Sequence, residues 1–146
     1  YYGDSEKECT CNYNQILKYN KKISGPILDR IDIRIKVPKV DIKDLFEKES
    51  GESSEKIKNR VIESTNIQLQ RQGKLNGKLS NKEIKKYINI SDEAETFLKN
   101  SAIKLKISAR SVNRILKISR TISDIYKKDK IDISHISEAL NFRGNF

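Results

Sequence analysis

The sequence has no tryptophan and no methionine, and its 146 residues include only two prolines, two cysteines and one histidine. No apolar run approaches the roughly 20 residues that a membrane-spanning helix needs, so we expect no membrane association of that kind. Cys9 and Cys11 are separated by one residue, and a disulfide across that spacing is strained, which argues against a secreted disulfide framework. No signal peptide is visible, and we expect a cytoplasmic protein. The start at Tyr1 favours a piece of a longer protein.

Basic residues dominate the charge, with 30 lysines and arginines against 20 acids and a formal net charge of +10. Such a balance favours polyanionic partners, such as nucleotide phosphates, nucleic acid or an anionic surface. Abundant lysine, isoleucine and asparagine also fit codon bias in an AT-rich genome, and both explanations stay open. Arginines are few, so their positions are more informative.

Apolar periodicity predicts helices over most of the chain. A capping box at Asn12 and Gln15 begins the first helix, and Gly25-Pro26 ends it. Residues 54–72 predict a long helix capped by Gly73. Its expected core-facing residues are Ile57, Val61, Ile62 and Leu69. Further helices are expected from Ser80, over 94–105, from Ser108 and over 134–142.

Residues 31–37 alternate apolar and charged side chains, which is the period of a β-strand. A single strand cannot satisfy its own edges, so it either pairs with a sheet built upstream or docks weakly on this chain. The predicted fold is mainly α: a bundle of four or five helices preceded by a helix-strand arm.

The stretch KISGPILDRIDIRIKVP, residues 22–38, places Arg30 between a Gly-Pro turn and the expected strand. A guanidinium on a short turn can donate bidentate hydrogen bonds to a phosphate, although spacing alone also fits surface pairing with Asp29 or Asp32. The stretch resembles the segment before the last core strand of Mg chelatase-like AAA+ ATPases (ComM/YifB type), which reads ISGPLLDRIDI. The resemblance implies that Arg30 is an arginine finger that acts in trans on a neighbouring subunit's nucleotide.

Residues 106–126, KISARSVNRILKISRTISDIY, resemble the lid helix of the same family, which reads LSARA-x-x-RILKVARTIADL. The resemblance implies that Arg110 is the sensor 2 residue, which contacts the γ-phosphate of ATP. A helix N-terminus itself favours anions, and loss of the γ-phosphate contact would let the lid rotate against the core. Taken alone, an arginine in a first helical turn usually faces water.

Residues 102–112 also have the spacing of a helix-turn-helix, although Lys106 stands at the left-handed turn where glycine is preferred. A stand-alone basic DNA-binding module is therefore the alternative function, and a basic helical protein-interaction domain is a third. In the DNA-binding alternative the contacts would come from Arg110, Asn113, Arg114 and Lys117.

The two ends of the chain carry further family patterns. In the family, a C-P-C-G segment precedes the YYGD at which this chain begins, and a second C-x-C like Cys9 and Cys11 follows. Four such thiolates would make a structural zinc site, of which this pair is half; otherwise the two are free thiols.

Residues 135–146 resemble the family's closing segment. His135 is expected to cap a helix or lie on the surface, and Arg143 to contact a neighbouring subunit.

The resemblance covers the chain from Tyr1 to about Arg143. It implies an ATP-driven motor, a homohexameric ring that needs ATP and Mg²⁺ and is linked to DNA handling such as branch migration in competence. The phosphate-binding loop and the acidic Mg²⁺-binding strand are absent, so this polypeptide alone is not expected to hydrolyse ATP. The expected domains are a remnant of the AAA+ core at 1–47, a linker at 48–54 and a helical lid at 55–146.

Overall fold

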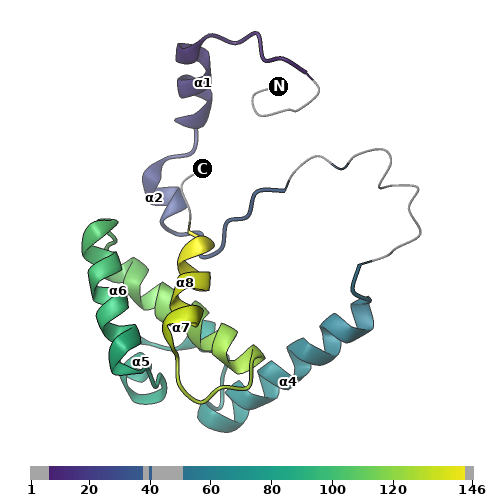
Figure 1. Ribbon diagram of the computed structural model, residues 1–146, viewed down its shortest axis with the longest axis vertical. Coiled ribbons are helices and arrows are strands. Elements are labelled where there is room, and N and C mark those ends of the chain that lie inside the picture. The colour runs from purple at the N-terminus through teal and green to yellow at the C-terminus, as the bar shows by residue number, and fades with distance from the viewer. Residues whose placement is uncertain (1–6, 38–39, 41–50, 144–146) are drawn as a thin grey trace. The chain divides into compact units, whose positions relative to one another are not determined.

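The computed structural model describes residues 7–37, 40 and 51–143 (Figure 1). The chain divides into two compact units, which are described separately. The first comprises Tyr1–Ile31 and Ile35–Lys48, and the second comprises Asp32–Arg34 and Glu49–Phe146. Among the described residues, no helix is long and apolar enough to cross a membrane.

The first unit contains helices α1 (Tyr13–Asn20) and α2 (Gly25–Leu28). The expected capping box begins α1. The Asn12 side chain accepts from the backbone N–H of Gln15 at 3.0 Å, and the Gln15 side chain accepts from the backbone N–H of Asn12 at 2.9 Å. The first helix ends several residues before Gly25-Pro26, which instead opens α2. Proline suits the first turn of a helix because its missing N–H has no intrahelical partner there.

The strand expected at 31–37 does not form. Among the described residues the only β-pairing is an isolated parallel bridge between Ile90 and Ile131, so this segment has no neighbouring strand to complete its hydrogen bonds. Asp32–Arg34 belong to the second unit, within which the Arg34 N–H donates to the Phe142 carbonyl at 2.8 Å.

The second unit is a helical bundle, as predicted. Its elements are α4 (Ser54–Gln72), the 3-10 turn η1 (Asn76–Lys78), α5 (Asn81–Tyr87), α6 (Asp92–Lys104), α7 (Ala109–Ile125) and α8 (Ile133–Asn141). Each α-helix of this unit begins after a serine or aspartate whose side chain accepts a backbone N–H, which satisfies donors that have no partner within the helix. Gly73 ends α4 in the left-handed conformation (φ 72°), as the sequence predicted.

Helix α7 is the centre of the bundle and packs against α4, α5, α8 and η1. Its apolar stripe meets residues from α6, α8 and the α7–α8 loop, which removes apolar surface from water and provides the main driving force for folding. The buried core consists of Ala94, Leu98, Ile115, Ile118, Ile122, Ile131, Ile136 and Ala139.

Helix α4 differs from its prediction in the face that it buries. The four apolar residues expected to face the core are 42–54% exposed: Ile57, Val61, Ile62 and Leu69. The helix buries Ser64 and Gln68 instead, because the surface that it meets is polar: the Gln68 side chain accepts from the Asn76 N–H of η1 at 2.8 Å. Figure 1 shows the N-terminal half of α4 extending away from the other helices of this unit.

The capping box of α5 predicts a dependence of stability on pH. Glu83 accepts from Lys74 at 2.6 Å and from the Ser80 N–H at 2.8 Å, and these hydrogen bonds, that from Lys74 first, lower the pKa of Glu83 from 4.5 to about 2. Because the folded pKa is the lower one, the stabilisation is complete above pH 4.5 and is lost as the pH falls toward 2.

We therefore expect Glu83→Gln to flatten the fall in the free energy of unfolding across that pH interval. Urea titrations at a series of pH values measure it, and Lys74→Gln should remove part of the same slope. A Glu83→Gln protein with the wild-type slope would contradict the assignment.

Candidate functional site

Arg110 lies in the first turn of α7, after the N-cap Ser108, whose hydroxyl accepts from the Ser111 N–H at 3.2 Å. Its side chain is exposed, and none of the described residues forms a salt bridge with it. The cap fixes the start of the helix, and the first-turn N–H groups and the helix dipole favour an anion there. The arrangement suits a guanidinium that reaches outward to a phosphate.

Arg30 lies in the first unit, in the turn that follows α2. Its backbone N–H donates to the Ile27 carbonyl at 2.9 Å, so the turn is hydrogen-bonded at the arginine itself. Its side chain is exposed, and it forms no salt bridge with the described part of the chain. Asp32, one of the two acids that spacing suggested as its partner, pairs instead with Arg114 of α7 at 2.7 Å.

The residues of the helix-turn-helix alternative have partners within the bundle. Besides the Arg114 salt bridge, Lys117 donates to the Gly77 carbonyl at 3.3 Å, and Asn113 donates to the Asn81 side chain at 3.1 Å. Lys106 has a φ of 51°, so the turn between α6 and α7 is left-handed, as a helix-turn-helix requires. The backbone turn thus fits the alternative, while these side chains are engaged by their own chain.

A buried polar cluster, which no motif in the sequence predicts, joins α4, η1 and α7. The Asp124 side chain has no exposed surface and accepts hydrogen bonds from three residues. Arg71 binds both of its oxygens at 2.6 and 2.9 Å, Arg120 donates at 2.7 and 3.0 Å, and Asn76 donates at 2.8 Å. The available signal was the pair of opposite charges four residues apart, Arg120 and Asp124, on the amphipathic helix α7.

Arg120 also donates to the carbonyls of Lys128 (2.7 Å) and Asp129, so the cluster holds the loop between α7 and α8. Burial alone would raise the pKa of Asp124, but the hydrogen bonds from Arg71, Arg120 and Asn76 keep it below its ordinary value. The carboxylate is therefore ionised near neutral pH and compensated by two guanidinium groups. Its place is structural: it attaches α4 to the helix that carries Arg110.

The two cysteines are free thiols, Cys9 half-buried and Cys11 exposed. A hydrogen bond from the Cys11 backbone lowers the pKa of the Cys9 thiol, which favours the thiolate form that binds metals. The described residues contain no group of three or more histidines, cysteines or acids placed to hold a metal ion.

At the C-terminal helix, His135 is buried and its Nδ1 accepts from the Asp132 N–H at 3.1 Å, which confirms the predicted capping role. Arg143, expected at a contact with a neighbouring subunit, donates to the Ser111 hydroxyl of its own bundle at 3.0 Å.

Family models match both parts of the chain. The model described as magnesium chelatase, subunit ChlI C-terminal, matches residues 51–143, and the model described as magnesium chelatase, subunit ChlI, matches residues 1–45. The chain belongs to the magnesium chelatase family. Arg30 lies within the match over residues 1–45, and Arg110 lies within the match over residues 51–143. Both the family resemblance and the mainly helical fold are confirmed.

Relatives of this magnesium chelatase family member include a competence protein and uncharacterized proteins. The chain is 38% identical over 130 residues to competence protein ComM of Haemophilus influenzae, covering 88% of this chain and 26% of that protein. It is 38% identical over 134 residues to the uncharacterized protein YifB of Salmonella typhimurium, covering 91% and 26%. For YifB of Escherichia coli the identity is 36% over 135 residues, covering 91% and 26%. The chain thus spans about a quarter of the length of these relatives.

Proposed function

We propose that this chain supplies two arginines to ATP hydrolysis in a ring-forming AAA+ ATPase. Arg30 acts in trans as an arginine finger on the nucleotide of a neighbouring subunit, and Arg110 is the sensor 2 contact to the γ-phosphate. One observation carries the proposal: each arginine is exposed on a hydrogen-bonded turn or helix start, without a salt bridge to the described residues, inside a region that a magnesium chelatase model matches.

In this proposal residues 1–47 are the last part of the AAA+ core, residues 48–54 are a linker and residues 55–146 are the lid. ATP and Mg²⁺ are held by the remainder of the full-length protein, and this polypeptide alone does not hydrolyse ATP. The guanidinium of Arg30 offsets the charge that develops on the transferred phosphoryl group. Arg110 contacts the γ-phosphate before hydrolysis and loses that contact afterwards, which changes the position of the lid.

The proposed motor is a homohexamer in the cytoplasm that acts on DNA, for example in branch migration during competence. Two observations support DNA: a relative is named competence protein ComM, and the chain carries a net charge of +10. In full-length rings that also carry the two cysteines of the family's C-P-C-G segment, Cys9 and Cys11 would supply two of the four thiolates of a structural zinc site.

Mixed rings test the trans role of Arg30. Wild-type full-length subunits are combined with subunits that carry Arg30→Ala and a distinguishable, photo-crosslinked nucleotide. We expect the Arg30→Ala subunit to hydrolyse its own ATP when its neighbour supplies an intact Arg30, because the finger belongs to the neighbour. If each subunit keeps or loses activity according to its own residue 30, the finger role is wrong.

The helix-turn-helix module remains the second candidate, and the left-handed turn at Lys106 is the observation that favours it. The two candidates differ in what Arg114 and Lys117 do. Arg114→Ala and Lys117→Ala are each measured for binding to duplex DNA and for ATP hydrolysis. If both variants lose duplex binding, bind with a weaker dependence of affinity on salt and keep normal ATP hydrolysis, the DNA-binding module is favoured.

A further inference from the structure

The helical unit has an open apolar groove between α5 and α6, called the α5–α6 groove. Its volume is about 510 Å³, and helices α5, α6 and α7 line it mainly with apolar side chains: Ile84, Leu98, Ala102, Ile103, Val112 and Leu116. Ile84 and Leu98 are buried, whereas Ile103 is 78% exposed. A partner that covers such apolar surface removes it from water, so the groove suits an apolar binding surface.

The α6 side of the groove is as long as two turns of an α-helix. It runs from Glu95 to Ile103, which are eight positions apart and therefore about 12 Å apart along the helix axis. An amphipathic helix laid in an apolar groove is a recurrent mode of protein recognition, in which apolar side chains three or four residues apart act as anchors. The groove therefore fits about two turns of such a helix.

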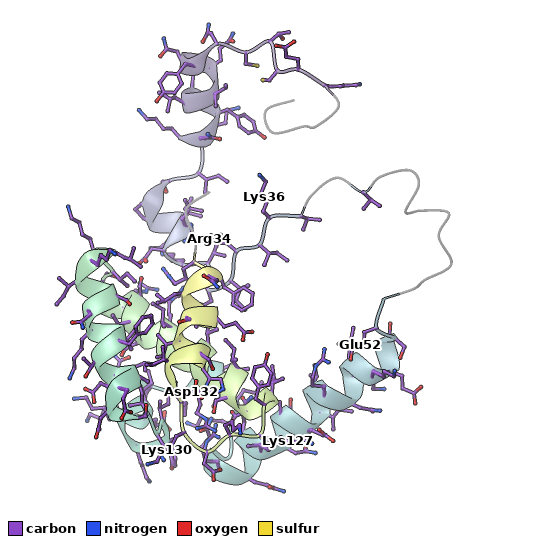
Figure 2. All side chains as sticks on the ribbon, viewed as in Figure 1. Arg34, Lys36, Glu52, Lys127, Lys130 and Asp132 are labelled. Atoms are coloured by element: carbon purple, nitrogen blue, oxygen red, sulfur yellow. The ribbon has the colours of Figure 1, made fainter. Side chains whose placement is uncertain are left out.

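The N-terminal half of α4 is an amphipathic helix whose apolar residues stay exposed in its own bundle. Ile57, Val61 and Ile62 lie within two turns and are 42%, 54% and 45% exposed, while the side that α4 buries is polar. Figure 2 shows the side chains of this half of α4, which begins just after Glu52, standing clear of the other helices of the unit. This half of α4 thus matches the length and the apolar character of the groove.

One chain cannot insert this half of α4 into its own groove. Figure 1 shows the N-terminal half of α4 directed away from α5 and α6, and the salt bridge from Arg71 to Asp124 holds the other half on α7. An α4 that enters the groove must therefore come from another copy of the chain. Such a contact joins two different surfaces, so each copy offers one α4 and one groove.

The charges beside the two surfaces are opposite. Lys85 borders the groove on α5, and Glu55 lies in the first turn of α4; both are exposed, and neither forms a salt bridge with the described residues. Glu55 precedes Ile62 by seven residues, so the two lie on the same face of α4. The acid that lines the groove, Glu95, already pairs with Lys99 at 2.7 Å. Lys85 is thus the cation that meets the acid beside the apolar residues of α4.

We propose that the α5–α6 groove binds the N-terminal half of α4 from a second copy of this chain, with Glu55 facing Lys85. The contact is heterologous, so it repeats from copy to copy and either closes into a ring or continues as an open chain. The inference goes beyond the proposed function, because the contact needs neither ATP nor the two arginines. Two helical turns make a small interface, so this chain alone associates weakly, in the micromolar range or above.

Sedimentation velocity of this chain over a concentration series tests the pairing. Wild type is expected to associate, and Val61→Glu on α4 or Ile103→Glu in the groove should raise the dissociation constant by at least about 10-fold, because each places a charge in an apolar contact. Both side chains are exposed, so circular dichroism should show unchanged helix content and melting. An equimolar mixture of the two variants should form a complex of one copy of each that grows no further, since each variant keeps the surface that the other lacks.

Charge reversal tests the orientation of α4 in the groove. Glu55→Lys or Lys85→Glu alone should weaken the association, because like charges then face each other, and a chain that carries both changes should associate like wild type. The matched control is Ile133 of α8, which is 42% exposed and lines neither surface. Ile133→Glu should associate like wild type.

Four outcomes would overturn the inference: a wild-type chain that stays monomeric throughout the series, a glutamate variant of α4 or of the groove that associates like wild type, a mixture of those two variants that stays monomeric, or a double charge reversal that associates no better than either single one. None of these outcomes bears on the finger or the sensor 2 role, because the ATPase assays of the arginine variants decide those separately.

Discussion

Replacing Arg30 with alanine in the full-length ring is expected to lower kcat for ATP hydrolysis by about 10³- to 10⁵-fold, which is what an arginine finger contributes. The loss should appear in kcat more than in KM, because the guanidinium acts mainly on charge that develops in the transition state. Steady-state phosphate release at saturating ATP measures it. Arg30→Lys should recover only part of the rate, since lysine keeps the charge but lacks the planar fork of donors.

The matched control is Arg60, another exposed arginine, which pairs with Glu52 at the start of α4. Arg60→Ala should leave kcat close to wild type, because that pair is solvent-exposed and remote in sequence from both matched motifs. A kcat for Arg30→Ala similar to that of Arg60→Ala would refute the finger role.

Replacing Asp124 with alanine is expected to lower the free energy of unfolding of the helical unit by about 3–5 kcal/mol, the cost of breaking a buried ion pair on one side. The substitution leaves the guanidinium groups of Arg71 and Arg120 without their carboxylate, and the Arg120 side chain is only 3% exposed. A loss of this size is a large part of the stability of a small domain. Urea unfolding followed by circular dichroism at low temperature measures it.

Asp132 provides the comparison, because it is also an aspartate of this unit but is the N-cap of α8 and its side chain is 55% exposed. Asp132→Ala removes the N-cap of α8 and should cost about 1 kcal/mol. Asp124→Asn keeps two hydrogen-bonding atoms but loses the charge, and should lie between the two. A cost for Asp124→Ala no greater than that for Asp132→Ala would show that the cluster contributes little.

The helix starts were predictable because capping is local. Ser80 with Glu83, and Ser108 before α7, lie within one turn of the bonds that they make, so their spacing in the sequence contains the signal. The inner face of α4 was not predictable in this way. Which residues a helix buries depends on the partner surface, and here the partner offers Asn76 and Asp124 rather than apolar groups.

In the candidate site too, local features were predictable from the sequence and long-range contacts were not. The positions of Arg30 and Arg110 came from motifs in the sequence, and the structure adds that both are exposed. The salt bridge from Asp32 to Arg114 joins residues 82 positions apart and has no local signature. The strand predicted at 31–37 failed for a related reason, since alternation describes one strand and cannot supply its neighbour.

The polar attachment of α4 has a consequence for the heat capacity of its opening. Exposure of apolar surface raises the heat capacity, whereas exposure of polar surface lowers it. Since α4 meets the bundle through Gln68, Arg71 and Ser64 and already exposes its apolar residues, separating it from α7 uncovers mainly polar groups. Local release of α4 should therefore have a free energy that varies almost linearly with temperature, while global unfolding of the isoleucine-rich core follows a curved profile. Amide hydrogen exchange at several temperatures would separate the two processes.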